Sequence, residues 1–176
     1  MKRKWELATW TTEWKQRYEN EAEILKEIFQ FEMLEIHHVG STSVPSIGYA
    51  KPIIDILIII TDIEKVSLYN EQMITAGYKV RGENGIPNRR YFTKGDYPRT
   101  HHVHIYQYRD AKITTYLDFK TFLIEHPQKA EMYGQLKLSI LESYSYDEYQ
   151  LEKEKRMNKL IEEALRWGEH RRNNNS

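Results

Sequence analysis

A turn of small and hydroxyl residues, followed by one carboxylate, carries the clearest chemistry in this chain. Residues 40–43 read Gly-Ser-Thr-Ser, and Asp55 stands further on in the otherwise aliphatic run 53–60. A glycine lets the backbone approach a phosphate closely, and the hydroxyls and amides after it can donate hydrogen bonds to phosphate oxygens. An acidic side chain on the next strand can hold a divalent cation against the same phosphates, so Asp55 is the candidate catalytic residue and metal ligand. The candidate phosphate-binding residues of the turn are Gly40, Ser41, Thr42 and Ser43.

Cationic and imidazole side chains extend this candidate site. Lys51 and Arg90 can neutralise phosphate charge, and an arginine can do so with two parallel hydrogen bonds. His102 and His104 alternate on an expected strand, so both side chains point to the same face. If that strand lies beside the Asp55 strand, the three side chains form a metal site of two imidazoles and one carboxylate, which suits Zn²⁺, Mn²⁺ or Fe²⁺ better than Mg²⁺. Phosphate binding and general-base catalysis stay open as other roles for the two histidines.

Two tyrosine–lysine pairs occur in the last third of the chain. Tyr133 and Lys137, and likewise Tyr149 and Lys153, have the i, i+4 spacing that places two residues on one face of a helix. Packing, contact with solvent and lining of a pocket are all open readings of these pairs.

Composition limits the classes of protein. The 176 residues include 40% hydrophobic and 30% charged residues, which is typical of a soluble globular domain. The absence of cysteine excludes disulfides, thiolate metal ligands and a cysteine nucleophile, and suits a cytoplasmic location. Lys and Arg number 26, as do Asp and Glu, so no net charge attracts nucleic acid or a membrane surface. The start of the chain lacks the pattern of a secretory signal, and the run 53–60 is too short to span a bilayer.

Hydrophobic periodicity indicates an α+β fold, with a mixed sheet flanked by helices and a helical C-terminal third. We expect one domain over residues 1–170 and a polar tail over 171–176. The sequence indicates no oligomeric state. The expected helices cover residues 11–29, 63–76, 112–125 and 128–143, with a last one from 145 onward. The expected strands cover residues 34–39, 53–61, 78–81, 90–93 and 101–108.

Several segments together resemble a known family. The segment "HHVGSTSVPSIGYAKPIIDILI" at 37–58 resembles the signature of the GrpB family, an uncharacterised bacterial family of the nucleotidyltransferase superfamily. The segments "RRYFTKG" at 89–95, "RTHHVHIY" at 99–106 and "LDFKTFLIEHP" at 117–127 extend the resemblance. It implies a nucleotidyltransferase-like fold and metal-assisted transfer of a nucleotidyl or phosphoryl group to a small-molecule acceptor. The implied cofactor is a divalent metal, Mg²⁺ or Mn²⁺ with Zn²⁺ as a third candidate, and the implied partner is a nucleotide or other phosphorylated small molecule.

The sequence departs from the superfamily in one respect. Active nucleotidyltransferases of this type carry two carboxylates one residue apart, whereas the residues at that spacing from Asp55 are Ile53 and Leu57. Two functions therefore stay open. One is the transfer reaction, and the other is a catalytically degenerate domain of the same fold that binds a nucleotide, coenzyme or other anionic metabolite.

Overall fold

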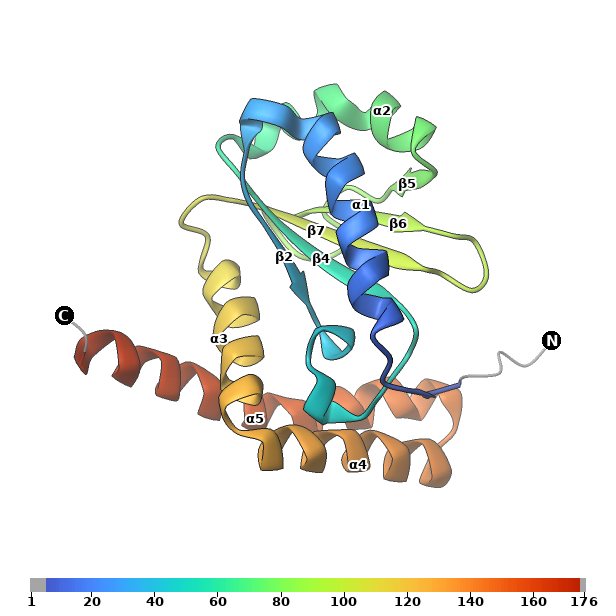
Figure 1. Ribbon diagram of the computed structural model, residues 1–176, viewed down its shortest axis with the longest axis vertical. Helices are drawn as coiled ribbons and strands as arrows, with labels where there is room; N and C mark the ends of the chain where they lie inside the picture. The colour runs from blue at the N-terminus through green and yellow to red at the C-terminus, as the bar shows by residue number, and fades with distance from the viewer. Residues whose placement is uncertain (1–5, 175–176) are drawn as a thin grey trace.

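The computed structural model describes residues 6–174 and contains a five-stranded mixed sheet with helices on both faces (Figure 1). The strand order is β2-β4-β7-β6-β5, and β4 and β7 are parallel whereas the other neighbours are antiparallel. The strands are β2 (Met33–Val39), β4 (Ile54–Ile60), β5 (Tyr78–Val80), β6 (Arg90–Lys94) and β7 (His101–Gln107). The predicted α+β class with a mixed sheet is confirmed.

Strand β4 lies inside the sheet because its residues are aliphatic on both faces, as is typical of a strand covered on both sides. Its even-numbered isoleucines, from Ile54 to Ile60, pack in the core formed with α1 (Glu13–Phe29) and α2 (Asn70–Thr75). Its odd-numbered residues Leu57 and Ile59 pack on the other face, which α3 (Ala111–Glu125) covers. Asp55 shares this second face and stands near the start of the strand, where a polar side chain need not enter the core.

The helix expected over residues 63–76 is instead a 3₁₀ helix, Ile63–Tyr69, followed by the short α2. The core contacts explain the difference. Ile63, Val66 and Tyr69 are three residues apart and all pack on the core around β4. That spacing matches the three residues per turn of a 3₁₀ helix.

The segment between β2 and β4 sits on the C-terminal helices. It contains the 3₁₀ turns Ser41–Ser43 and Pro45–Ile47 and the short strand β3 (Tyr49–Ala50), which pairs with β1 (Ala8–Thr9). Helices α4 (Pro127–Ser143) and α5 (Tyr146–Asn174) pass beneath this segment (Figure 1). Val44 and Ile47 are buried there against side chains of α3, α4 and α5. The helical third of the protein therefore supports the turn that carries the candidate phosphate-binding residues.

Residues 171–174 of the expected polar tail are helical, because α5 continues to Asn174. Two arginines at this end bind back to α3: Arg171 pairs with Glu125 at 2.8 Å and Arg172 with Asp118 at 2.7 Å. Residues 175 and 176 lie outside the described part of the chain. Within residues 6–174, no helix is both long enough and apolar enough to cross a membrane.

Candidate functional site

The start of β7 lies directly beside the start of β4. In their parallel pairing His102 is opposite Asp55, and His104 is opposite Leu57. Side chains at opposed positions of neighbouring strands point to the same face of the sheet. The structure therefore brings Asp55, His102 and His104 together, as the conditional prediction required. His101, one residue earlier, points to the opposite face, where its Nε2 lies 3.8 Å from Glu21.

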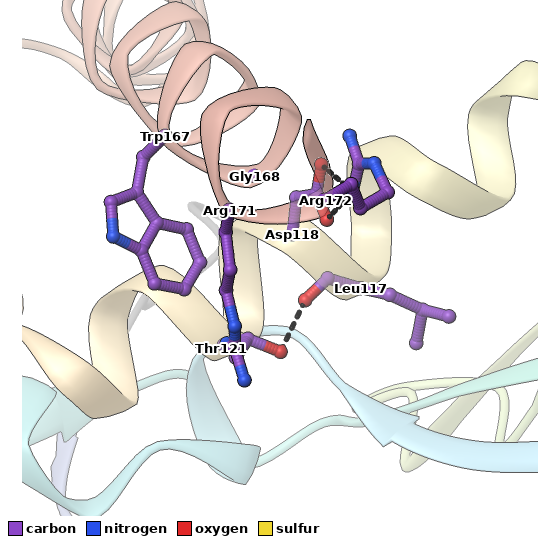
Figure 2. A pocket seen from close by; sticks show the side chains of 7 residues that line it. All are labelled: Leu117, Asp118, Thr121, Trp167, Gly168, Arg171 and Arg172. Carbon is purple, nitrogen blue, oxygen red and sulfur yellow. Dashed lines mark hydrogen bonds and ion pairs between the residues drawn. The ribbon is translucent and has the colours of Figure 1, made fainter. Parts of the chain in front are cut away.

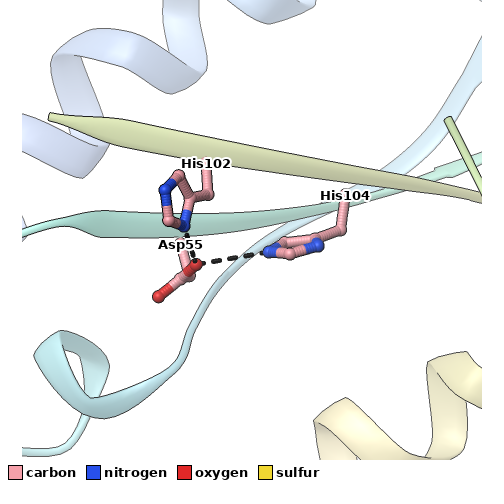
Figure 3. A group of neighbouring side chains, drawn as sticks. All are labelled: Asp55, His102 and His104. Carbon is pink, nitrogen blue, oxygen red and sulfur yellow. Dashed lines mark hydrogen bonds and ion pairs between the residues drawn. The ribbon is translucent and has the colours of Figure 1, made fainter. Parts of the chain in front are cut away.

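The two imidazoles converge on one carboxylate oxygen (Figure 3). Oδ1 of Asp55 lies 3.3 Å from Nδ1 of His102 and 3.2 Å from Nε2 of His104. The three side chains are 28%, 20% and 11% exposed, respectively, so the cluster is sheltered but open to a ligand. Burial acts to raise the pKa of Asp55, but hydrogen bonds from the two histidines outweigh it and lower the pKa. Asp55 is therefore ionised at neutral pH.

Two tyrosines hold the imidazoles in place. The ring of Tyr91, on β6, lies 5.6 Å from that of His102 and 5.1 Å from that of His104. The hydroxyl of Tyr116, on α3, lies 3.4 Å from Nδ1 of His104. Both nitrogens of His104 are thus engaged. The buried Nε2 of His102, in contrast, has no hydrogen-bond partner among residues 6–174.

The donor set fits a divalent cation. One ligand atom from each of the three side chains lies within 4.8 Å of the other two. Nitrogen and oxygen ligands of a tetrahedral metal, at about 2.0–2.2 Å from it, stand roughly 3.4 Å apart, close to the spacings at Asp55. Two imidazoles with one carboxylate suit Zn²⁺, Mn²⁺ or Fe²⁺. A ligating histidine usually donates a hydrogen bond from its second ring nitrogen, and the Tyr116 hydroxyl oxygen lies 3.4 Å from Nδ1 of His104, where it can accept that bond.

Leu57 occupies one of the two positions at which the resemblance implies a second carboxylate. Leu57 shares the face of Asp55 but is fully buried in the core, so this position offers no ligand. His104 lies directly opposite Leu57 on β7. The imidazoles of the neighbouring strand thus supply donors where the resemblance implies a carboxylate.

The Gly40 turn is built against Asp55. Gly40 has a φ of +71°, and a Cβ atom there would lie 2.6 Å from Oδ2 of Asp55. The Thr42 hydroxyl is 2.9 Å from Nε2 of His38, and the Ser43 hydroxyl donates to the Gly40 carbonyl at 2.6 Å. These two hydroxyls hold the turn, whereas the hydroxyl of Ser41 interacts with Tyr133 below it.

Replacing Gly40 with alanine should disturb the carboxylate as well as the backbone. The positive φ alone should cost about 1–3 kcal/mol of the free energy of unfolding. The added methyl would also displace the Asp55 carboxylate and weaken metal binding. Urea unfolding and Mn²⁺ titration measure the two effects.

Gly48→Ala is the matched control, because Gly48 has a φ of +80° but open space around its Cβ position. It should lose stability and keep its metal affinity. Equal metal affinities of the two variants would show that the contact with Asp55 is unimportant.

The two predicted cations lie in different places. Arg90 is opposite Ile105, so it is on the other face from the cluster, and its guanidinium pairs with Glu64 at 2.9 Å and Glu83 at 3.9 Å. The structure does not bring Arg90 to Asp55. Lys51, in contrast, follows β3 at the end of the turn segment, and its Nζ lies 5.0 Å from the centre of the Tyr149 ring.

Two further lysines accompany Lys51. Lys137, on α4, is 3% exposed and donates from Nζ to the carbonyl of Tyr49 at 2.6 Å. Lys153, on α5, is half-buried, and burial lowers its pKa. Burial and the neighbouring lysine charges lower the pKa of both Lys51 and Lys137 to about 7. The two tyrosine–lysine pairs on the C-terminal helices therefore place lysines beneath the turn.

A family comparison covers most of the chain. The family model described as "GrpB protein" matches residues 4–163. The chain belongs to the GrpB family. This GrpB chain is 42% identical over 176 residues to the UPF0157 protein YqkA of Bacillus subtilis, covering 99% of this chain and 51% of that relative. It therefore spans about half the length of YqkA.

A solved structure of a family member agrees with the fold. The crystal structure of the conserved protein GrpB from Enterococcus faecalis superposes with a TM-score of 0.86 and 40% sequence identity, covering 92% of this chain and 98% of that one. A weaker likeness, with a TM-score of 0.44 and 11% identity, covers 66% of this chain and 41% of a Cid1 poly(U) polymerase structure.

A hollow between α3 and α5 of this GrpB chain does not coincide with the cluster. Asp118 is buried there and accepts hydrogen bonds from Arg172 at 2.7 and 3.0 Å (Figure 2). Gly168 allows α5 to come close to that carboxylate. Because Arg172 already neutralises the charge of Asp118, we interpret the hollow as part of the packing contact between α3 and α5. Its lining residues are Leu117, Asp118, Thr121, Trp167, Gly168, Arg171 and Arg172.

Replacing Lys137 with methionine should stabilise the GrpB fold at low pH. Below about pH 7 the Lys137 ammonium is charged in both the folded and the unfolded protein, and burying it lowers the free energy of unfolding. Between about pH 7 and 10.5 the unfolded chain binds a proton at this lysine that the folded protein does not bind. The free energy of unfolding therefore rises with pH in this range, and the destabilisation caused by Lys137 declines. Lys137→Met should therefore gain roughly 1–4 kcal/mol at pH 6, and less at pH 9. Urea unfolding of both proteins at the two pH values measures this. A difference that does not change with pH would contradict the burial of a titrating ammonium.

Proposed function

We propose that this GrpB chain binds a divalent cation through Asp55, His102 and His104 and assists nucleotidyl or phosphoryl transfer to a small-molecule acceptor. The observation that carries the proposal is the convergence of three ligand atoms within 4.8 Å, directly beside the Gly40 turn. The turn offers small residues and a hydroxyl next to the cation ligands. Such an arrangement can hold a phosphate against a metal.

The residues have separate roles in this proposal. A bound cation would neutralise phosphate charge and polarise a phosphoryl oxygen. Gly40 leaves room for the Asp55 carboxylate beside the turn, and Ser41 with amides of the turn donates to the phosphate oxygens. Lys51 adds positive charge from the end of the same segment. Tyr116 and Tyr91 keep the two imidazoles oriented.

The transfer itself requires positioning more than covalent chemistry by the protein. An atom of the acceptor forms a bond to phosphorus and loses its proton, while the bond from that phosphorus to the leaving group breaks. The substrate is a nucleotide or another phosphorylated small molecule. Because two of the three donors are imidazoles, we propose that Mn²⁺ or Zn²⁺ is bound in preference to Mg²⁺.

Metal titration followed by a turnover assay tests the proposal. Calorimetry should show Mn²⁺ or Zn²⁺ binding with a 1:1 ratio and tighter than Mg²⁺. The metal-loaded protein is then incubated with nucleoside triphosphates and a pool of hydroxyl-, amine- and phosphate-bearing acceptors, and phosphorus NMR follows new products. Product that requires both the cation and Asp55 supports transfer. Failure of the wild type to bind any of the three cations would overturn the metal site.

The absence of a second acid favours an alternative, a domain that binds without catalysis. Among the described residues, the metal cluster at this site contains Asp55 as its single carboxylate. Nucleotide binding that depends on the cation and on Asp55, without turnover of any acceptor, would identify this function.

A further inference from the structure

Three lysines from three separate segments gather beneath the Gly40 turn. Lys51 follows β3, Lys137 lies on α4 and Lys153 lies on α5. The charge of Lys153 acts on both Lys51 and Lys137, and the charge of Lys137 acts on Lys51. The three ammonium groups therefore share one partly buried region.

Two of the three lysines lack an ion-pair partner in the described part of the chain. Neither Lys137 nor Lys153 has a carboxylate oxygen of a described residue within 4.0 Å of its Nζ. Lys137 donates to a neutral carbonyl, that of Tyr49. Burying ammonium groups beside one another is costly unless an opposite charge compensates them. The burial of Lys137 and Lys153 without such a partner suggests that an anion completes the cluster.

The lysine cluster also interacts electrostatically with the carboxylate of the metal site. The charge of Asp55 acts on Lys51 and on Lys153, and on Tyr133 in between. The hydroxyl of Ser41 interacts with Tyr133, whose ring lies 4.8 Å from Nζ of Lys137. The Gly40 turn, Tyr133 and Lys137 thus connect the two charged clusters.

We infer that Lys51, Lys137 and Lys153 form a subsite for the outer phosphates of a ligand that carries at least two consecutive phosphates. This inference rests on the proposed function, in which the cation at Asp55 holds the phosphate that reacts. A single phosphate carries a charge of about −1.5 to −2, which is less than the charge of the three lysines when all of them are protonated. A diphosphate or triphosphate tail matches them better and can extend from one cluster to the other. The substrate class is then a nucleoside diphosphate or triphosphate, or another compound with a phosphoanhydride.

Close packing of α4 supports the subsite. Gly134 lets α4 approach the backbone of Ile47, since a Cβ there would overlap the Ile47 carbonyl oxygen. This contact sets the height of Tyr133 and Lys137 relative to the turn. The ring of Tyr149, a residue of α5 that is 3% exposed, packs against Nζ of Lys51. The lysines are therefore held by packed elements.

Calorimetry with inorganic phosphates tests the inference. Binding of orthophosphate, pyrophosphate and tripolyphosphate is measured with EDTA present, so that no cation contributes, and Mn²⁺ binding is measured separately without phosphate. We expect affinity to rise from orthophosphate to tripolyphosphate. Lys153→Gln and Lys51→Gln should each weaken tripolyphosphate binding about tenfold or more. Lys155→Gln, an exposed lysine on the same helix, should change it less than twofold.

The outcomes separate the two proposals. Mn²⁺ binding without any preference for tripolyphosphate would overturn the subsite and leave the metal site standing. Lysine-dependent tripolyphosphate binding by a protein that binds none of Mn²⁺, Zn²⁺ and Mg²⁺ would overturn the proposed function and retain the subsite. Equal weakening by Lys155→Gln would show attraction by general charge and would also overturn the subsite. Circular dichroism of each variant checks that it is folded.

Discussion

Replacing Asp55 with asparagine should lower the affinity for Mn²⁺ or Zn²⁺ at least about 100-fold while the protein stays folded. Loss of a hydrogen-bonding partner behind a metal ligand already costs 10–100-fold in affinity, and Asp55 is a direct ligand in the proposed site. Asparagine keeps the shape that the Gly40 turn requires but removes the charge on which both imidazoles converge. Calorimetric titration of the two proteins at the same pH measures the ratio of affinities.

Controls on the same strand sharpen this prediction. His102→Gln should weaken metal binding, whereas His101→Gln should not, because His101 points to the opposite face toward Glu21. Both changes replace an imidazole on β7 with a neutral amide of similar size. An Asp55→Asn protein that bound the metal within threefold of the wild type would refute the proposed ligand set. So would equal losses in the two histidine variants.

The metal cluster shows which part of a site can be inferred from sequence. Strand alternation alone places His102 and His104 on one face. Their position beside Asp55 depends on the parallel pairing of β4 with β7, two strands separated in the chain by α2, β5 and β6. Such a crossover leaves no local signal, so the sequence predicts the cluster only on the condition that the two strands are neighbours.

Arg90 illustrates the same limit. Alternation requires Arg90 and Tyr91 to point to opposite faces of β6. It does not say which face carries the site. Tyr91 lies against the histidines, and Arg90 consequently lies on the face with Glu64. The pairing of β6 with β7, which is a tertiary property, decides the face.

The lysine cluster is beyond sequence analysis for another reason. Helical spacing predicts that Tyr133 lies beside Lys137, and the structure places Nζ of Lys137 4.8 Å from the tyrosine ring. The predicted boundaries of α4 are nearly right. The direction in which each pair faces depends on how α4 and α5 dock under the turn. The polar end of α5 escapes prediction likewise, because Arg171 and Arg172 find carboxylate partners only in the folded protein.

Replacing Gly134 with alanine should destabilise the fold and weaken both clusters. The added methyl would overlap the Ile47 carbonyl oxygen, a backbone atom that cannot turn aside. Such overpacking typically costs about 1–3 kcal/mol, and occasionally more, of the free energy of unfolding. The loss must also exceed the roughly 1 kcal/mol that alanine normally gains over glycine within a helix. Urea unfolding measures the net effect.

Gln135→Ala is the matched control, because Gln135 is the exposed next residue of α4. Its free energy of unfolding should change by less than about 0.5 kcal/mol. In Gly134→Ala, a raised α4 would carry Lys137 away from Tyr49 and loosen the support under the Gly40 turn. Tripolyphosphate binding should therefore fall more than Mn²⁺ binding, because the lysine lies on the displaced helix and the metal ligands lie on the sheet. A Gly134→Ala protein as stable as the wild type would show that α4 does not depend on this close approach.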